Sequence, residues 1–410
     1  MSCIAQGIFY CHKKIRIIDN YVLYILCYSD INETKHKGGK KMKKRLLAVL
    51  MSTALVATML VGCGGTSGEV ADDSSSETTT ATEESATVGV AMPTKDLQRW
   101  NQDGENMKSQ LESAGYTVDL QYANNDVATQ VTQIETMISS GVDMLVIAAI
   151  DGESLGTPLA SAKEANIPVI AYDRLIMNSD AISYYATFDN YAVGQKQGEY
   201  IEEALGLKDA GDATYNLEIF TGDPGDNNAN FFYGGAMDVL QKYIDAGTLV
   251  VPSGQTEFAA VATQEWSTEK AQARMDTLLS SHYASGLTLD AVLCSNDSTA
   301  LGVTNAIEAG YTGEYPIITG QDCDIANVKN LLADKQAMDI FKDTRTLAEQ
   351  VVKMVDAVLS GSEAQVNDEE TYDNGTGIIP TFLCEPVVTT KDNYQEILID
   401  SGYYQESDLQ

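Results

Sequence analysis

The chain contains few of the side chains on which metal and redox chemistry usually depend. Its 410 residues include three histidines and seven cysteines, and no group of them has the close spacing of a zinc or iron site. Tryptophan occurs only twice, and proline eight times. The scarcity of histidine and the wide separation of the cysteines argue against a transition-metal centre, so we expect neither a metal nor another cofactor.

Basic residues are scarce beyond the first 45 positions. The chain has 26 Lys and Arg against 59 Asp and Glu, and 10 of the bases and three of the acids precede residue 46. The remainder therefore holds 16 bases and 56 acids, a net charge of −40. So acidic a protein repels a phosphate backbone, which argues against nucleic-acid binding and for high solubility outside the cell.

The N-terminal region has a pattern typical of exported bacterial proteins. A basic stretch at 40–45 precedes an apolar run at 46–61, which is shorter than the ~20 residues that a membrane span needs. Leu60-Val61-Gly62-Cys63 follows and resembles the lipobox of a lipoprotein signal. We therefore predict a signal peptide over 42–62, a lipid on Cys63 and an extracytoplasmic, membrane-anchored protein.

The segments on either side of this signal are not expected to fold. Residues 1–41 are interpreted as an extension from a mis-assigned start, with Met42 as the true beginning, and a hydrophobic leader around 15–28 is the alternative. Residues 63–86 are rich in Ser, Thr and acids and are predicted to form a flexible tether. Beyond Cys63, an odd set of three cysteines makes no disulfide framework, and we predict small core residues at Cys294, Cys323 and Cys384.

From residue 87 the chain alternates short β-branched runs with amphipathic segments. This order predicts parallel strands with helices on both faces, and the pattern restarts near residue 217, which indicates two lobes with a cleft between them. The predicted strands are 88–92, 118–122, 144–149, 168–172, 183–188, 217–220, 249–251, 291–294 and 317–319. The predicted helices are 107–113, 128–139, 158–165, 230–246, 269–281, 299–309 and 325–333.

An acid and a base stand together where the apolar run 167–172 ends. Ligands bind at the carboxyl ends of strands in open α/β sheets, so Asp173 and Arg174 are candidate binding residues. A carboxylate accepts and a guanidinium donates hydrogen bonds, and the pair suits vicinal hydroxyls such as those of a sugar. A strand-end salt bridge is the plainer interpretation of an isolated pair.

Other strand ends carry similar residues, which strengthens the binding interpretation. Asp151, Asn296 and Asp322 follow three further predicted strands. Asn and Asp also cap helices, and capping is the favoured interpretation for Asn228, Asp297 and Asp324. Capping does not explain the two tryptophans, which lie near strand-to-helix junctions. An indole face can stack on the C–H face of a pyranose, so both are candidate sugar contacts, and packing in the core is the alternative. These residues are Trp100 and Trp266.

Taken together, these motifs resemble the periplasmic pentose- and hexose-binding proteins, especially the multiple-sugar-binding and D-xylose-binding receptors of ABC importers. The resemblance covers about 87–410, with the motifs in family order. It is carried by Met92-Pro93-Thr94-Lys95, Arg99-Trp100, Ala171-Tyr172-Asp173-Arg174, Ser295-Asn296-Asp297, Gly320-Gln321-Asp322 and Phe341-Lys342-Asp343-Thr344-Arg345.

The resemblance implies a type I periplasmic binding protein, in which two Rossmann-like lobes joined by a three-strand hinge close on a monosaccharide. It implies lobes formed by 87–187 with 343–379 and by 188–342 with 380–410, and crossings near 187–190, 342–344 and 380–382. The implied ligand contacts of the first lobe are Arg99, Trp100, Asp151, Asp173 and Arg174. Those of the second lobe are Asn228 or Asn230, Trp266, Asn296, Asp322 and Lys342. Related proteins place an Arg near 223–230, where this chain has Asp and Asn, so the preferred sugar stays open.

We therefore expect a monomeric receptor that delivers a pentose or hexose, such as xylose, glucose, galactose or arabinose, to an ABC permease. A sugar sensor for a two-component kinase or a chemoreceptor is the alternative, and a glycosidase-like enzyme a distant one. Against an enzyme, Arg174 and Lys342 would keep neighbouring carboxylates ionised, and no predicted strand is followed by a P-loop, a dinucleotide fingerprint or a nucleophile elbow.

Overall fold

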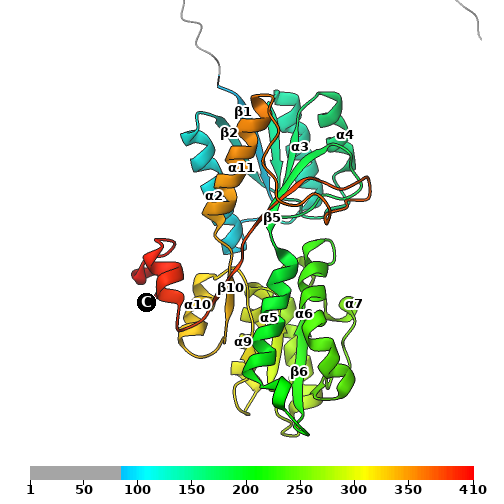
Figure 1. The fold of residues 1–410 in the computed structure, drawn as a ribbon, viewed down its shortest axis with the longest axis vertical. Helices are drawn as coiled ribbons and strands as arrows, with labels where there is room; N and C mark the ends of the chain where they lie inside the picture. The colour runs from blue at the N-terminus through cyan, green and yellow to red at the C-terminus, as the bar shows by residue number, and fades with distance from the viewer. Residues whose placement is uncertain (1–84) are drawn as a thin grey trace, which may run out of the picture. The chain divides into compact units, whose positions relative to one another are not determined.

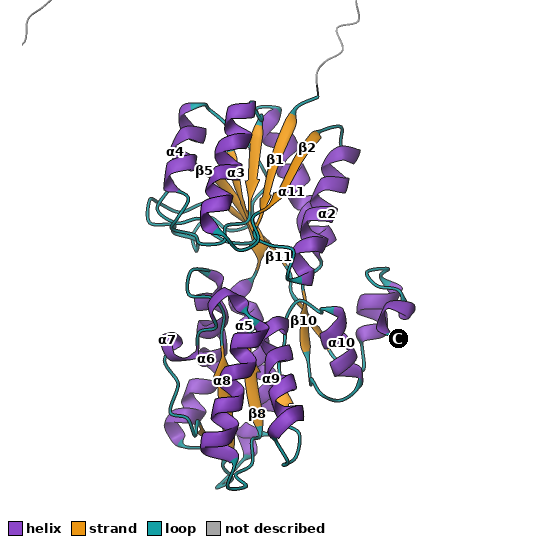
Figure 2. Cartoon of the chain, turned by 180° about the vertical axis from the view of Figure 1, so that it is seen from behind, coloured by secondary structure: helices purple, strands orange, loops and turns teal. Residues whose placement is uncertain are grey.

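The computed structural model describes residues 85–410 (Figure 1). The predicted extension at 1–41, the signal peptide at 42–62, the lipidation site Cys63 and the tether up to residue 84 lie outside the described residues. Two α/β lobes follow from residue 87, and the predicted pair of doubly wound parallel sheets is confirmed (Figure 2).

The first lobe is a six-stranded parallel sheet in the order β11-β5-β4-β3-β1-β2. Helices α2 and α11 cover one face, where Met107, Leu111 and Leu347 join the core, and α3 and α4 cover the other. Its elements are β1 (Thr87–Met92), α2 (Gln98–Ser113), β2 (Thr117–Tyr122), α3 (Val127–Ser140), β3 (Met144–Ile147), α4 (Gly156–Glu164), β4 (Val169–Tyr172), β5 (Ile182–Phe188), α11 (Thr344–Leu359) and β11 (Thr381–Cys384).

The second lobe is a four-stranded parallel sheet in the order β7-β6-β8-β9, beside an antiparallel pair formed by β10 and β12. Helices α8 and α9 cover one face of the larger sheet, and α5 and α6 cover the other. Its elements are α5 (Asn190–Ala204), η1 (Leu207–Asp209), β6 (Tyr215–Phe220), α6 (Asn228–Ala246), β7 (Leu249–Val250), α7 (Phe258–Val261), η2 (Gln264–Trp266), α8 (Thr268–Leu278), η3 (Leu279–Tyr283), β8 (Ala291–Cys294), α9 (Asp297–Gly310), β9 (Ile317–Ile318), α10 (Ile325–Leu332), β10 (Asp339–Phe341), β12 (Val387–Thr389), η4 (Gln395–Asp400) and η5 (Glu406–Leu409).

The chain passes between the lobes three times. The first two passages, from β5 into α5 and from β10 into α11, lie within the ranges expected at 187–190 and 342–344. The third was expected at 380–382, but Thr381–Cys384 pairs in parallel with β5 and so belongs to the first lobe. The passage therefore falls between Cys384 and Val387, because Thr381 and Cys384 are buried in the first lobe.

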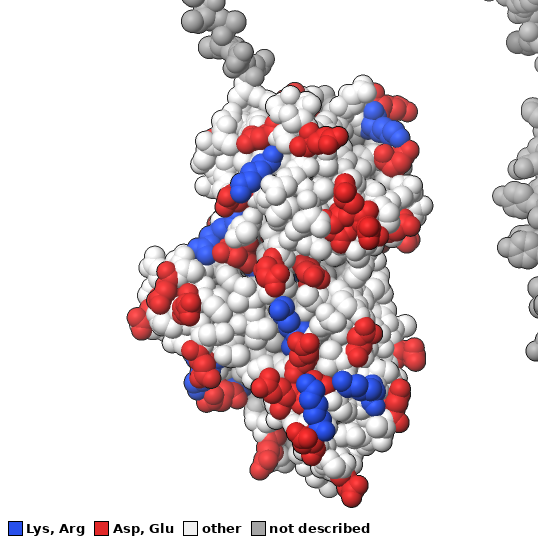
Figure 3. Space-filling model, in the orientation of Figure 1, with Lys and Arg blue, Asp and Glu red and all other residues white. Residues whose placement is uncertain are grey.

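Local signals explain where several helices begin and end. Asp126 accepts a hydrogen bond from the Thr129 N–H at the start of α3, and Gly141 ends that helix with a left-handed φ of 80°. Asp343 caps α11 in the same way, through the Arg345 N–H. The three described cysteines are free and buried, as predicted. Figure 3 shows acidic side chains spread over both lobes on the face in view, with fewer basic ones between them.

Candidate ligand-binding cleft

A cleft lies between the lobes, at the carboxyl ends of strands from both sheets. The space enclosed between its lining residues, including the part open to solvent, is about 420 Å³. The first lobe lines it with Leu97, Arg99, Trp100, Asp173 and Arg174, and the second with Asp226, Asn228, Phe232, Trp266, Asn296, Ser298, Gln321, Asp322, Asp324 and Lys342.

The backbone takes an unusual conformation at three of these residues. Asp173 directly follows β4 with φ 58°, Asp322 has φ 102° and Trp266 has φ 53°. A positive φ is costly for residues other than glycine, and such strain concentrates at functional sites. These turns, after β4 and β9 and at the end of η2, thus place the three side chains along the cleft.

Arg99 is the charged centre of the first lobe. Its Nη2 lies 2.5 Å from Asp173 Oδ1, its Nε lies 2.9 Å from Asp103 Oδ2, and its Nη1 lies 3.5 Å from Asp322 Oδ1 in the other lobe. Burial disfavours the charge on Arg99, but Asp173, Asp103 and Asp322 outweigh burial and raise its pKa well above the usual value. Arg99 therefore stays cationic and fixes three carboxylates around it.

Asp173 remains an ionised hydrogen-bond acceptor. Burial alone would raise the pKa of Asp173, but the nearby charges of Arg99, Lys342 and Arg174 lower it below the usual range. The backbone carbonyl of Asp173 also accepts hydrogen bonds from Tyr185 Oη at 2.6 Å, Thr187 Oγ1 at 2.8 Å and Asn228 Nδ2 at 2.7 Å. Strand β5 and the start of α6 therefore fix this residue in place.

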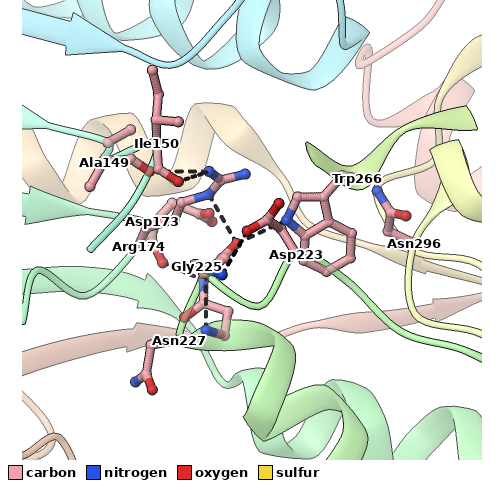
Figure 4. A network of polar contacts seen from close by, with 12 residues as sticks. Ala149, Ile150, Asp173, Arg174, Asp223, Gly225, Asn227, Trp266 and Asn296 are labelled. Carbon is pink, nitrogen blue, oxygen red and sulfur yellow. Dashed lines mark hydrogen bonds and ion pairs between the residues drawn. The ribbon is translucent and has the colours of Figure 1, made fainter. Parts of the chain in front are cut away.

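Arg174 also joins the two lobes, through contacts in both of them (Figure 4). Its Nη1 donates to the carbonyl oxygens of Ala149, at 3.1 Å, and Ile150, at 3.3 Å. Its Nε lies 3.0 Å from Oδ2 of Asp226 in the second lobe, an ion pair by distance, and the same oxygen accepts a hydrogen bond from Trp266 Nε1 at 3.2 Å. Burial raises the pKa of Asp226, although the charge of Arg174 opposes that shift.

Two indole rings supply flat apolar surface among these charges. Trp100 is 2% exposed, and the guanidinium carbons of Arg99 and Arg174 lie 4.7 and 5.0 Å from its ring centroid. Trp266 is held edge-on against Phe232, with 6.1 Å between ring centroids. The two rings belong to different lobes, so a ligand between them would contact aromatic surface on both sides.

Acidic side chains gather behind the cleft in the second lobe. Lys342 Nζ lies 3.0 Å from Asp322 Oδ1, whereas the fully buried Asp297 and Asp339 share Gln336 as a hydrogen-bond donor. Burial, followed by repulsion from neighbouring acids, raises the pKa of Asp297, and burial raises the pKa of Asp339 to about 7. At neutral pH this group therefore holds protons that a solvated carboxyl would have lost.

This acidic group makes a testable prediction about pH. Because the folded-state pKa values of Asp297 and Asp339 lie above the ordinary value of 3.8, the folded protein binds more protons than the unfolded chain between about pH 4 and pH 7. The free energy of unfolding must then fall as the pH rises through this window. We expect calorimetry to give a higher melting temperature at pH 5 than at pH 8, and Asp339→Asn, which mimics the protonated acid, to reduce the difference.

A suitable control for this experiment is Asp180→Asn, because Asp180 is exposed and pairs with Lys163 on the surface. This variant should leave the difference in melting temperature between pH 5 and pH 8 nearly unchanged. An Asp339→Asn variant with the same pH dependence as the unmodified protein would show that Asp339 is ionised throughout this range.

The cleft brings together nine of the eleven residues that the sequence indicated as ligand contacts. Asp151 and Asn230 are not among its lining residues. Asp151 Oδ1 accepts a hydrogen bond from the Glu153 N–H at 2.8 Å, and Asn230 Nδ2 lies 3.5 Å from the Asn227 carbonyl oxygen. Of the two alternatives Asn228 and Asn230, Asn228 is the one that lines the cleft.

The structure corrects the predicted helix caps. Asn228 is the first residue of α6, and its side chain binds Tyr185 and the Asp173 carbonyl instead of the helix. The cap of α9 is Asn296, which accepts from the Thr299 N–H at 3.1 Å, whereas Asp297 accepts from the Asp324 N–H at 2.7 Å. Asp324 occupies the cap position of α10 but makes no capping hydrogen bond.

Six lining residues were not singled out as contacts from the sequence. Within the described part of the chain, Gln321 Oε1 and Asp324 Oδ1 are buried without a hydrogen-bond partner, so both are available to a hydroxyl group in the cleft. Both residues lie within two positions of Asp322 in the sequence, and this proximity could have indicated them as contacts. The six are Leu97, Asp226, Phe232, Ser298, Gln321 and Asp324.

A two-lobed α/β fold that encloses a small cleft of paired charges and aromatic rings defines a ligand-binding protein of the bilobal class. Residues 88–363 match the model of the periplasmic binding protein domain. The chain belongs to this family, which confirms the predicted resemblance and places the protein outside the cytoplasm. Among the described residues, none of the helices combines the length and apolar character that crossing a membrane requires.

Individual relatives also indicate a binding protein of this family. A multiple sugar-binding periplasmic protein of Azospirillum brasilense is 49% identical over 353 residues, which cover 85% of this chain and 95% of the relative. A D-xylose-binding periplasmic protein of Escherichia coli is 34% identical over 330 residues, 80% of this chain and 94% of the relative. The crystal structure of an ABC transporter solute-binding protein from Clostridium phytofermentans with bound β-D-glucose is 70% identical, with a TM-score of 0.78, and covers 79% of this chain and 100% of its own. These relatives are binding proteins and not enzymes.

Proposed function

We propose that this protein captures a monosaccharide, a pentose or hexose, in the interlobe cleft and delivers it to an ABC importer. The observation that carries the proposal is the cleft itself, in which Asp173, Arg174 and the two tryptophans lie together. Carboxylates and guanidinium groups match the hydroxyls of a sugar, and the indole faces match its C–H surfaces. The relative that is 70% identical and contains β-D-glucose makes glucose the first candidate.

Closure of the two lobes explains how such a site binds. The first lobe offers Arg99, Trp100 and Asp173, and the second lobe adds its polar groups when the hinge closes. Direct contacts between the lobes, such as the hydrogen bond from the Gly152 N–H to the Gly225 carbonyl at 3.1 Å, would stabilise the closed arrangement. A ligand that contacts both lobes therefore shifts the equilibrium towards the closed state.

A thermal-shift screen of the purified protein against aldoses tests the proposal. Glucose, xylose, galactose and arabinose are compared with ribitol and with buffer alone. A ligand at 100 times its Kd adds about 2.7 kcal/mol to the free energy of unfolding, which raises the melting temperature by several degrees. A shift with one or a few aldoses, repeated by calorimetric titration, supports the proposal. No shift with any sugar contradicts it.

A second experiment separates cleft residues from the two sequence-indicated residues outside it. We expect Asp151→Asn and Asn230→Ala to bind the sugar within about threefold of the unmodified affinity, because neither side chain lines the cleft. Asn228→Ala should weaken binding by more than tenfold, since it loses the hydrogen bond to the Asp173 carbonyl. Equal losses in Asn228→Ala and Asn230→Ala would show that the contact is not specific to Asn228.

We further propose that the protein acts as a monomer attached to the membrane through a lipid on Cys63. The lipobox at 60–63, which follows a basic stretch and the short apolar run at 46–61, supports the lipid attachment. Cys63→Ala should move the protein from the membrane fraction to the soluble fraction, without affecting sugar affinity.

Stimulation of the permease ATPase by sugar-loaded protein would support transport, whereas a response only from a sensor kinase would favour the sensory alternative.

A further inference from the structure

The C-terminal tail, defined here as residues 390–410, lies on the second lobe close to the cleft but outside it. In Figure 1 it is the red segment beside α10. Tyr404 is 6% exposed and packs with Cys323, Phe341 and Leu398 in an apolar cluster of that lobe. No tail residue lines the cleft. The tail is therefore well anchored, and its polar contacts with the first lobe require a separate explanation.

The Tyr404 hydroxyl joins the two lobes directly. It accepts hydrogen bonds from Gln98 Nε2 at 2.7 Å and from Gln102 Nε2 at 3.0 Å, both on α2 of the first lobe. It donates to the Cys323 carbonyl oxygen of the second lobe at 2.9 Å. A phenol has one proton and two lone pairs, so all of its hydrogen-bonding capacity is used at this point.

Two further contacts extend the same junction. The Tyr403 hydroxyl donates to Gln102 Oε1 at 3.1 Å, and Gln98 Oε1 accepts from the Ile325 N–H, at the start of α10, at 3.2 Å. The Tyr403 ring also packs against Phe341, with 4.8 Å between centroids. Two glutamines on α2 therefore each make two hydrogen bonds with the second lobe and its tail, and none of these bonds involves a charged cleft residue.

The junction adjoins the cleft on both of its sides. Gln98 directly precedes Arg99 and Trp100, and Cys323 directly follows Asp322. Arg99 and Asp322 face each other across the cleft at 3.5 Å. Tyr404 thus holds together the two backbone segments that present opposing ligand-contact residues.

We propose that Tyr403 and Tyr404 form a closure latch with Gln98 and Gln102, and that this latch controls how slowly a bound ligand leaves. These are positioning residues, because they act through α2 and the loop after β9 and do not touch the ligand. The inference rests on the proposed function, since it requires lobes that open and close around a ligand. Opening of the lobes breaks the bonds to both glutamines, so the latch stabilises only the closed state.

The latch therefore predicts a kinetic signature. A ligand binds the open protein, in which the latch is not formed, and leaves after the latch breaks. Tyr404→Phe keeps the ring but removes three hydrogen bonds, and we expect it to raise the dissociation rate constant of glucose about tenfold and to change the association rate constant less than twofold. If the hydroxyl had only a structural role, Tyr404→Phe would lower the melting temperature but would not raise the dissociation rate constant selectively.

Stopped-flow fluorescence measures both rate constants for Tyr404→Phe, Gln102→Met and the double variant. If the two side chains act together, the effects on dissociation are less than additive in the double variant. Tyr394→Phe is the matched control, because Tyr394 packs in the same cluster and its hydroxyl has no hydrogen-bond partner within residues 85–410. It should leave both rate constants unchanged.

The outcomes distinguish the latch from the proposed function. If the unmodified protein binds none of the sugars, the proposed function fails, and small-angle scattering of the ligand-free variants still tests the latch through an increased radius of gyration in Tyr404→Phe. If the unmodified protein binds sugar but Tyr404→Phe dissociates at the unmodified rate, the latch is overturned and the binding function stands. Fully additive effects of Tyr404→Phe and Gln102→Met overturn it as well.

Discussion

Asp173→Asn is expected to weaken sugar binding about 100- to 1,000-fold. The substitution keeps the shape of the side chain but removes a buried negative charge that lies 2.5 Å from Arg99. Loss of one partner from a buried, hydrogen-bonded charge pair costs about 2–5 kcal/mol, and every 1.4 kcal/mol is a tenfold change in affinity. The carboxylate is also an acceptor for ligand hydroxyls, because surrounding cations keep it ionised.

Calorimetric titration with the sugar identified in the screen measures this effect. Asp180→Asn makes the same change at an exposed position of the same lobe and should bind normally. Circular dichroism and the melting temperature show whether the Asp173 variant is folded. A folded Asp173→Asn variant with an affinity within threefold of the unmodified protein would exclude Asp173 from the binding site.

Gly222→Ala is expected to have the second-largest effect, although glycine has no side chain to contact a ligand. A Cβ at this position would lie 1.9 Å from Cη2 of Trp266, and 2.0 Å from Cζ2 of the same ring. The indole must therefore move away from Gly222, which breaks its hydrogen bond to Asp226 and displaces one wall of the cleft. Overpacking a site costs ~1–3 kcal/mol, so we expect sugar affinity to fall about 5- to 100-fold.

Two further variants isolate this cause. Gly234→Ala adds the same methyl group in α6 of the same lobe, where the nearest atom of Tyr191 is 3.7 Å away, so affinity should not change. In a Trp266→Leu background the ring is absent, and Gly222→Ala should then add little to the loss already caused by Trp266→Leu. A full additional loss in that background would show that Gly222 acts independently of Trp266.

The sequence predicted the two sheets and most of the cleft for one physical reason. Parallel strands present their carboxyl ends at the same edge of a sheet, so polar residues that follow apolar β-branched runs, such as Asp173 in the first lobe and Asp322 in the second, must lie at that edge of their own sheet. Trp100 and Trp266 stood out because tryptophan occurs only twice in the chain. Asp151 also follows a strand, but its carboxylate instead supports its own turn through the Glu153 N–H.

Other features could not be predicted because they depend on tertiary geometry. Asp226 lies in a loop rich in Asp and Asn, and nothing local indicates that Arg174 of the other lobe reaches it. The choice between Asn296 and Asp297 as cap of α9 turns on a shift of one residue, which capping preferences do not resolve. Helix α11 was not among the predicted helices, although Leu347, Val351, Met354 and Val355 have a helical spacing that could have indicated it.

The place of β11 in the fold has a consequence for how the protein is made. This strand pairs with β5 and completes the first lobe, yet in the sequence it follows all four strands of the second lobe's larger sheet. The first lobe therefore cannot be completed until the strands of the second lobe's larger sheet have been synthesised. Until the ribosome has produced β11, one side of β5 has no partner strand, so the nascent first lobe exposes an open sheet edge. A chaperone that recognises extended, unpaired backbone would be able to bind at this edge while residues 189–380 are being synthesised.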